Sequence, residues 1–439
     1  MRKHASFIVT AAVALTVVFL VGNRLTSVQG QGQAMPARVA AVPGEKGGQD
    51  MYGAYEVVAG WPKPLSSVPG VGQWTWGAGQ GVFAETPNRV FVLERGMLPE
   101  IGRPKPQKIA PSVEFPIGRL PWRDATSASP PGMLFKRGTE NTTREPGDDL
   151  DVGEPGVDYK WGRIINVIDA QGNHIEDWTQ YDKMFRRPHS VFESPYDPQK
   201  DVWIVDDYRH AIFRFSNDGK KLLQTIGTVN VPGNDATHFY RPTFMAWAPN
   251  GDFYVADGYA NTRVVKFDKS GKYLMTWGEK GTNAGGPDAK PEARPNYFNN
   301  VHGVAVDPQT GNVFVNDRGN KRIQKFDANG KYLDSWSVGK APADIHLIYM
   351  DGSRMLWAFD RASSKMIKYD LNGNLQYTFG MWGPIPGGFW GVHGMHVDSA
   401  GNLYVAEVDN GGAQKFAPRA GANPAFLVTK PAAPTTGTR

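Results

Sequence analysis

The chain has 439 residues, with 48 lysines and arginines against 43 aspartates and glutamates, and it contains no cysteine. The lack of cysteine excludes disulfides, thiolate zinc sites, iron–sulfur clusters and a cysteine nucleophile. The net charge of +5 is small and the basic residues are interspersed with acidic ones, so the sequence carries no nucleic-acid footprint. The 51 glycines and the aromatic content of 12% favour many short strands over helices.

The N-terminus has the layout of an export signal. Basic residues Arg2 and Lys3 precede an uncharged apolar run from Ala5 to Gly22, and a polar stretch follows. The run is also long enough for an uncleaved membrane anchor. We expect residues 1–30 to be a signal peptide or membrane anchor, and the rest of the chain to be exported to the periplasm or the extracellular space. Membrane contact is expected only through this segment.

Three further regions lack the pattern of a folded core. Residues 31–54 are rich in Gly, Ala, Pro and Gln, which predicts a linker, and residues 418–439 are rich in Ala, Pro, Thr and Gly, which predicts a disordered tail. Residues 97–160 are Pro/Gly-rich, charged and weakly periodic. We expect them to form an insertion that is either an ordered loop or lid on one rim of the fold, or a spacer.

Between these ends the sequence repeats itself. Clear copies of one unit begin at His189, Thr243, His302 and His393, and a weaker copy begins near Asp344. Each unit holds four short alternating runs separated by Gly, Asn and Asp, whose pairs supply the positive φ angles of tight hairpins. A period of about 40–60 residues with four strands is typical of a propeller blade.

The count predicts an all-β fold, a six-bladed β-propeller over residues 55–417. Blade 1 begins near Trp74 and resumes after the insertion, ending near Trp178. The last blade has no fourth strand after Phe416, whereas the early strand Tyr55–Ala59 has no blade of its own. We predict that this N-terminal strand completes the last blade and closes the ring, which removes the exposed edges of an open array.

Three of the nine histidines occupy the same place in the repeat. His189, His302 and His393 each precede the first strand of a blade, and that strand lines the central channel of a propeller. Blades 2, 4 and 6 are related by a near-threefold rotation, so the three imidazoles should converge at one mouth of the channel. Three neutral imidazoles suit Zn²⁺ with a fourth position left for water or substrate. The alternative is a polar repeat position filled by structural histidines.

The other histidines are interpreted differently. The counterparts of the three histidines in blades 3 and 5, near Thr243 and Asp344, are not histidine. The histidines read as surface or packing residues are His174, His210, His238, His346 and His396.

Three further residues are candidates for catalysis. Tyr259 follows the second strand of blade 3 and should lie on the same rim as the histidines, where a phenol beside a dication and an arginine can serve as a base. Arg95 and Arg318 occupy matching hairpins in blades 1 and 4, where a guanidinium can hold a carboxylate by two hydrogen bonds. The alternatives are a tyrosine packed in a turn and arginines paired with neighbouring acids.

The repeats resemble NHL repeats, and one stretch is more specific. Residues 231–278, with the motif Val255-Ala-Asp-Gly-Tyr-Ala-Asn-Thr-Arg263, resemble the peptidyl-α-hydroxyglycine α-amidating lyases, and the similarity covers about residues 55–416. The resemblance implies a zinc-dependent lyase that cleaves the N–C bond of a peptidyl-α-hydroxyglycine, giving an amide and glyoxylate. Its substrate would be a small molecule or a peptide C-terminus, bound by a monomer.

The resemblance also implies roles for residues. His189, His302 and His393 match the zinc ligands of the family, Tyr259 matches its catalytic tyrosine, and Arg95 and Arg318 match its active-site arginines. Gly394 stands where the family has an acidic calcium ligand, so a structural Ca²⁺ is doubtful here.

Two other functions stay open on the sequence. One is a non-catalytic exported NHL propeller that binds a peptide or glycan on its rim. The other is a gluconolactonase-like metallohydrolase, a class whose sites use a ring of carboxylates and amides around calcium, unlike the histidines here.

Overall fold

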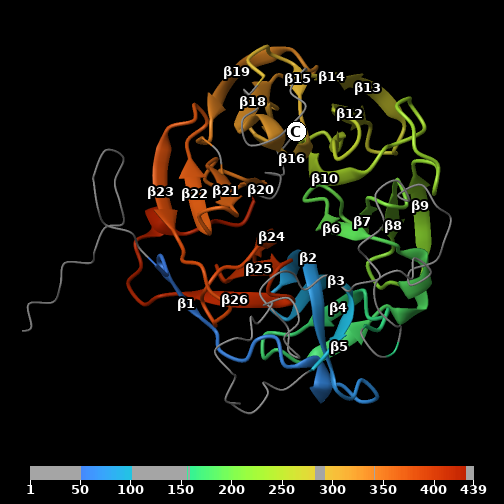
Figure 1. Ribbon diagram of the computed structural model, residues 1–439, viewed down its shortest axis with the longest axis vertical. Coiled ribbons are helices and arrows are strands. Elements are labelled where there is room, and N and C mark those ends of the chain that lie inside the picture. The colour runs from blue at the N-terminus through green and yellow to red at the C-terminus, as the bar shows by residue number, and fades with distance from the viewer. Residues whose placement is uncertain (1–50, 101–155, 157–158, 282–291, 341, 432–439) are drawn as a thin grey trace, which may run out of the picture.

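The computed structural model describes residues 51–100, 156, 159–281, 292–340 and 342–431. Within these residues, six four-stranded antiparallel sheets are arranged around a central axis (Figure 1), so the prediction of a six-bladed propeller is confirmed. The predicted signal or anchor segment lies outside the described residues, as do most of the predicted insertion and the end of the predicted tail. No helix among the described residues is long and apolar enough to cross a membrane.

The strands follow one another from the axis outward in each of the first five blades. Blade 1 consists of β2 (Trp74–Thr86), β3 (Arg89–Pro99), β4 (Ile165–Ile168) and β5 (His174–Asp177). Blade 2 consists of β6 (Pro188–Glu193), β7 (Val202–Asp206), β8 (Ala211–Phe215) and β9 (Leu222–Ile226). Blade 3 consists of β10 (Pro242–Trp247), β11 (Phe253–Asp257), β12 (Arg263–Phe267) and β13 (Tyr273–Trp277).

The remaining blades have the same plan. Blade 4 consists of β16 (Val301–Val306), β17 (Val313–Asp317), β18 (Arg322–Phe326) and β19 (Tyr332–Ser337). Blade 5 consists of β20 (Ile345–Met350), β21 (Leu356–Asp360), β22 (Lys365–Tyr369) and β23 (Leu375–Phe379). Blade 6 consists of β24 (Val392–Val397), β25 (Leu403–Glu407), β26 (Ala413–Pro418) and β1 (Tyr55–Val57).

Short elements complete the described structure. A two-stranded parallel sheet is formed by β14 (Glu279–Lys280) and β15 (Tyr297–Phe298). The 3₁₀ turns are η1 (Leu65–Ser67), η4 (Thr179–Met184), η5 (Arg318–Asn320) and η6 (Pro424–Phe426).

The burial of each strand depends on its distance from the axis. The second strands of blades 2 to 6, such as β7 with the sequence VWIVD, are buried along their whole length because both faces of each sheet meet a neighbouring blade. The outermost strand β13 alternates exposed and partly buried residues and ends on the buried Trp277. Between blades 2 and 3, Trp203, Trp247 and Phe253 form one cluster of aromatic rings. The core therefore consists of a layer between each pair of blades.

The ring is closed as predicted, by the N-terminal strand. β1 pairs antiparallel with β26, with Tyr55 opposite Pro418 and Val57 opposite Phe416, and Figure 1 shows the blue β1 beside the red β26. The Tyr55 side chain is fully buried, and its hydroxyl accepts a hydrogen bond of 2.8 Å from the backbone N–H of Val428. One tyrosine therefore joins the beginning of the fold to the segment that follows its last strand.

Residues 419–431 fall in the predicted tail, and the structure places them against blades 5 and 6. The Phe426 ring stacks on Tyr377 with centroids 4.6 Å apart, and Val428 is buried. The segment continues to Lys430, whose ammonium donates a hydrogen bond of 3.1 Å to the carbonyl of Glu85 in blade 1. It thus reaches the rim of one mouth of the channel.

Replacing Tyr55 with alanine is expected to lower the free energy of unfolding by about 3–5 kcal/mol, because it leaves a cavity at the closure of the ring and an unpaired Val428 N–H. The matched control is Leu222→Ala on the exposed strand β9, with an expected loss below about 1 kcal/mol. Urea unfolding of both variants measures the difference. Equal losses would show that β1 contributes no more than a surface strand.

Candidate active site

The side chains at one end of the channel are aimed by an irregularity that recurs in the innermost strands. The ladder between the first two strands skips His189 in blade 2, His302 in blade 4 and His393 in blade 6. A bulge of this kind re-aims the side chain of the extra residue. The same skipped position, which we call the ring position, is occupied by Gln80 in blade 1.

In five blades, a buried carboxylate holds the backbone just before the ring position. The last residue of the second strand accepts a hydrogen bond from a backbone N–H two or three residues before the ring position. These pairs, at 2.7–3.0 Å, are Asp206 with Arg186, Asp257 with Tyr240, Asp317 with Asn299, Asp360 with Asp344 and Glu407 with Trp390. The aspartates that the sequence repeats therefore position the strand that carries the candidate ligands.

The three histidines converge as the repeat predicts. One nitrogen from each of His189, His302 and His393 lies within 4.8 Å of the others, all three residues are buried, and their ring centroids are 4.5–5.4 Å apart. Nδ1 of His302 lies 2.7 Å from the carbonyl oxygen of His346, and Nδ1 of His393 lies 2.8 Å from that of Gln80. In these two histidines Nδ1–H therefore donates to a carbonyl, which places the lone pair on Nε2, the atom that a metal would bind. Nδ1 of His189 is buried without a hydrogen-bond partner.

Electrostatics favour the same protonation state. Burial lowers the pKa of His189, His302 and His393 well below the ordinary value, and the neighbouring imidazoles and arginines lower it further. Neutral imidazoles are the form that binds a metal. The chemistry of this donor set, three buried nitrogens with no acidic residue among them, fits a borderline-soft divalent ion such as Zn²⁺ better than Ca²⁺.

Phe244 and Tyr259 close the space around the histidines. The Phe244 ring lies 5.1–5.4 Å from the ring centroids of all three. The Tyr259 hydroxyl lies 2.8 Å from Nε2 of His302 and 3.1 Å from Nε2 of His189. A Cβ on the preceding Gly258 would collide with the carbonyl oxygen of Val301, so the glycine allows the turn that carries Tyr259 to lie against β16.

The ring position of blade 3 is Thr243, which points back into the sheet. Its hydroxyl donates to the carbonyl of Ala256 at 3.0 Å and also lies 3.3 Å from that of Val301. A short side chain at this point leaves the Tyr259 hydroxyl between two histidines. The structure therefore brings Tyr259 to the rim that the sequence predicts.

Two expectations about blade 5 are wrong. The ring position there is His346, which the ladder skips between Ile345 and Leu347, so it is neither Asp344 nor an ordinary packing residue. Its ring centroid lies 5.6 Å from that of His393 and 5.9 Å from that of His302, and its Nε2 lies 3.5 Å from Oδ2 of Asp344. The sequence hides this position because Leu347 follows His346, whereas a glycine follows His302 and His393.

The two predicted arginines lie near Tyr259 but differ in exposure. Arg318 keeps 18% of its side chain exposed, lies 5.6 Å from the Tyr259 ring centroid, and pairs with Asp344 at 3.5 Å. Arg95 is buried, and its Nε donates to the carbonyl of Pro188, next to His189, at 3.1 Å. Burial lowers the pKa of Arg95 to about 9, and the nearby Arg187 adds to the effect, but the guanidinium stays charged at neutral pH.

Two more arginines share this rim, and the sequence analysis missed them. Arg187 and Arg241 lie 5.6 and 4.7 Å from the Tyr259 ring centroid, and both cover the ring of Tyr208. Asp207 accepts from Arg241 at 3.0 Å and from Arg187 at 3.3 Å. The sequence does contain a pattern that could have identified them: each arginine begins an Arg-Pro dipeptide and stands two residues before a ring position.

The position of the doubtful calcium ligand lies deeper in the channel. A Cβ on Gly394 would lie 2.9 Å from the Cα of Gly81 and 3.1 Å from the backbone N of Val82. An acidic side chain there would require the facing strand β2 to move. This geometry argues against a carboxylate ligand at position 394.

The buried His396 is expected to make the folded protein less stable at acidic pH. Burial lowers the pKa of His396 to about 3, and its Nδ1 accepts from the backbone N–H of Ala84 at 3.1 Å. Between pH 6.5 and 3 the unfolded chain binds a proton at this side chain that the folded protein excludes, so stability falls as the pH falls. At pH 5 the loss from this one residue is about 2 kcal/mol.

The variant His396→Gln keeps a hydrogen-bond acceptor but cannot take up the proton. We expect its free energy of unfolding to fall by about 2 kcal/mol less than that of the wild type between pH 7.5 and pH 5. Urea unfolding at the two pH values, with a chelator present, measures this difference. Parallel losses in both proteins would mean that His396 does not titrate on unfolding.

Comparisons with known proteins found relatives in sequence and in structure. Residues 298–326 match the family model of the NHL repeat. The chain is 29% identical over 281 residues to peptidyl-alpha-hydroxyglycine alpha-amidating lyase 1 of Drosophila melanogaster, over 60% of this chain and 50% of that protein. It is 34% identical over 166 residues to a probable lyase of the same name in Caenorhabditis elegans, over 38% and 43%. Among solved structures, a streptogramin B lyase aligns with a TM-score of 0.43 and 11% identity, over 81% of this chain and 96% of that one.

The chain is thus a six-bladed β-propeller that matches the NHL repeat over residues 298–326 and has a buried three-histidine cluster that could bind a metal. Its sequence resembles the peptidyl-α-hydroxyglycine α-amidating lyases. The matched region spans half of the Drosophila relative and less than half of the Caenorhabditis one.

Proposed function

We propose that the protein is a zinc-dependent lyase that cleaves the N–C bond of a peptidyl-α-hydroxyglycine-like carbinolamide, releasing an amide and glyoxylate. The observation that carries the proposal is the convergence of three neutral imidazoles and the Tyr259 hydroxyl at one point, among arginines. The amidating lyases among its relatives support the reaction class. The apolar N-terminal run supports an exported protein, and we propose that it acts as a monomer.

His189, His302 and His393 would hold the metal through their Nε2 atoms. When bound, Zn²⁺ supplies Lewis acidity that makes the α-hydroxyl of the substrate easier to deprotonate. The buried Phe244 beneath the rings keeps water from one side of the histidines and limits their movement.

The arginines bind and orient the substrate. Arg318 would bind the substrate carboxylate, which becomes the carboxylate of glyoxylate. Asp344 lies 3.5 Å from Arg318 and uses only some of the N–H donors of its guanidinium group. Arg187 and Arg241 add positive charge on the same rim, although each already donates a hydrogen bond to Asp207. Arg95, buried against the Pro188 carbonyl, positions the start of β6 and with it His189.

Tyr259 moves the proton. Tyr259, which must be a phenolate to act as the base, takes the proton of the α-hydroxyl, the electrons of that O–H bond form the aldehyde C=O, and the C–N bond breaks with its electron pair on nitrogen. The amide nitrogen then takes a proton back from Tyr259. The products are a primary amide and glyoxylate, and the side chain ends as it began.

The test is glyoxylate release from a peptide that ends in α-hydroxyglycine, by full-length protein loaded with Zn²⁺. We expect stoichiometric glyoxylate and peptide amide, and none from the same peptide ending in glycine. Metal-loaded protein that releases no glyoxylate would contradict the proposed reaction. Hydrolysis of a sugar lactone in place of this activity would indicate the metallohydrolase, and peptide binding without turnover would indicate a binding propeller.

A further inference from the structure

The opposite mouth of the channel holds a cavity that the proposed reaction does not use. The ring positions lie at the beginning of the innermost strands, whereas the ends of the same six strands line a cavity of about 340 Å³. Its volume is at the low end of the range for small-molecule sites. The loop after β6 and the segment that carries Lys430 complete its rim.

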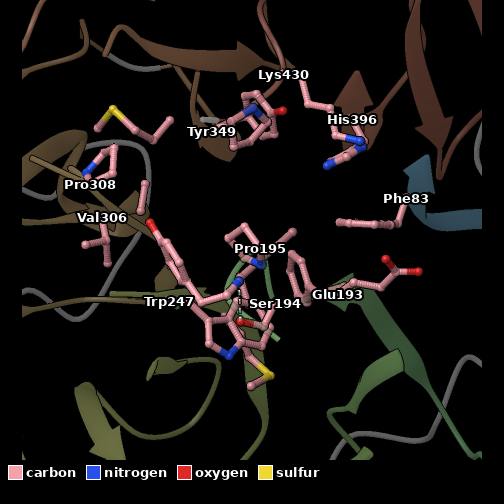
Figure 2. A pocket seen from close by; sticks show the side chains of 18 of the residues that line it. Phe83, Glu193, Ser194, Pro195, Trp247, Val306, Pro308, Tyr349, His396 and Lys430 are labelled. Carbon is pink, nitrogen blue, oxygen red and sulfur yellow. Dashed lines mark hydrogen bonds between the residues drawn. The ribbon is translucent and has the colours of Figure 1, made fainter. Parts of the chain in front are cut away.

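The cavity has an apolar side and a polar corner. Figure 2 shows Trp247, Val306 and Pro308 on one side of it, and Glu193, His396 and Lys430 around Phe83 on the other. The Phe83 and His396 rings are in contact, with centroids 3.9 Å apart. A ligand that fills this space must therefore have an apolar body and a polar group at one end.

The polar corner offers hydrogen-bond donors. Nδ1 of His396 accepts from Ala84 N–H, so the ring proton is on Nε2, which has no partner among the described residues. Lys430 uses one ammonium hydrogen on the Glu85 carbonyl and has two more. Glu193 is 6% exposed, and its Oε1 is buried without a hydrogen-bond partner.

The protonation state of Glu193 fits the same pattern. Burial, with a contribution from the nearby Glu85, raises its pKa to about 8 against the opposing effects of Lys200, Arg89 and Lys430. The raised pKa favours the neutral O–H form, a donor, at pH 7. The cavity also includes Asp197 and Asp351, but Asp351 accepts from Trp357 Nε1 at 2.9 Å and Asp197 lies 3.7 Å from Arg214.

Lys430 is the cation at this corner whose charge is not shared with a carboxylate. Arg89 pairs with Glu85 and Glu176, and Lys200 also pairs with Glu85. Lys430 has no carboxylate partner among the described residues and donates to the Glu85 backbone carbonyl. Its positive charge is therefore available to a carboxylate ligand.

We propose that this cavity binds a small monocarboxylate with an apolar body, its carboxylate held by Lys430, His396 and Glu193 and its body packed against Trp247 and Val306. Donors and the unpaired charge of Lys430 meet at one end of an apolar space, and a carboxylate presents acceptors only. Phe244 lines this cavity and also lies 5.1–5.4 Å from the three histidine rings, so its ring stands between the proposed site and the histidine cluster.

Calorimetric titration of the full-length protein with octanoate, octan-1-ol and octylamine tests this assignment. We expect octanoate to bind with a stoichiometry of one, and octanol and octylamine to bind at least about tenfold more weakly, because they lack the acceptor pair. Octanol binding as tightly as octanoate, or no saturable octanoate binding, would overturn the proposal.

Variants locate the site. Lys430→Met is expected to weaken octanoate about tenfold and to leave octanol unchanged, whereas the matched control Lys220→Met, on an exposed hairpin of blade 2, leaves both unchanged. Arg318→Met, at the other mouth, is expected to leave octanoate binding unchanged. If Arg318→Met removes octanoate binding and Lys430→Met does not, the carboxylate binds at the histidine end and the proposal is wrong.

The pH dependence separates the role of Glu193. Octanoate affinity of the wild type is expected to fall as the pH rises through about 8, where Glu193 becomes an anion beside the ligand. Glu193→Gln keeps a donor and should bind octanoate with no such fall. The same fall in both proteins would remove Glu193 from the site.

Discussion

The proposed function predicts that the variant His302→Ala loses zinc binding and glyoxylate release while it stays folded. The three histidines share one site with ligand atoms within 4.8 Å of one another, so the loss of one leaves two imidazoles, too few for a tight zinc site. Purified wild type should hold about one zinc per chain after dialysis and the variant nearly none. Because the metal contributes several kcal/mol to catalysis, glyoxylate release should fall at least about a thousandfold.

His346→Ala is the matched control for this experiment. His346 occupies the same ring position in blade 5, and its contribution to His302 is its backbone carbonyl, which alanine retains. The control should keep its zinc. Equal zinc in the wild type and His302→Ala, or equal loss in both variants, would contradict the assignment of the three ligands.

The variant Tyr259→Phe is expected to keep its zinc and to lower kcat by about 100- to 10,000-fold, the usual contribution of a positioned acid or base. Phenylalanine preserves the ring that lies against Arg241 and between the histidines, so only the hydroxyl is removed. The measurement is the steady-state rate of glyoxylate release beside zinc analysis of the same sample.

Tyr208→Phe is the control for the loss of a hydroxyl on this rim. Tyr208 is buried under Arg187 and Arg241, and its hydroxyl shares a hydrogen bond with Arg187. We expect its kcat to change less than threefold, roughly the net effect of one hydrogen bond. A Tyr259→Phe enzyme as fast as this control would assign the proton transfer to another group.

The architecture was predictable because the same sequence pattern recurs in each blade. The alternating runs, the Gly and Asn turns and the unpaired strand at Tyr55 follow from local chemistry, and they identified six blades and their closure. What could not be predicted is the order of residues 419–431, whose Ala/Pro-rich composition suggests a tail. Val428 and Phe426 are held there by Tyr55 and Tyr377, contacts that exist only once the ring has closed.

The residues of the site that lie in regular repeats could be predicted from the sequence. His189, His302 and His393 stand at equal places in clear repeats, so symmetry alone brings them together. His346 was missed because blade 5 is degenerate and its bulge is visible only in the ladder. Arg187 and Arg241 were missed because they lie before the strand, and their shared partner Asp207 comes from another part of the chain.

The central claim, that imidazoles from alternate blades hold one metal ion, is tested most directly by X-ray absorption at the zinc edge of the metal-loaded protein. We predict a first shell that includes three imidazole nitrogens at about 2.0–2.1 Å, with the outer-shell scattering of histidine rings. A first shell of oxygen ligands with one imidazole or none would contradict the claim.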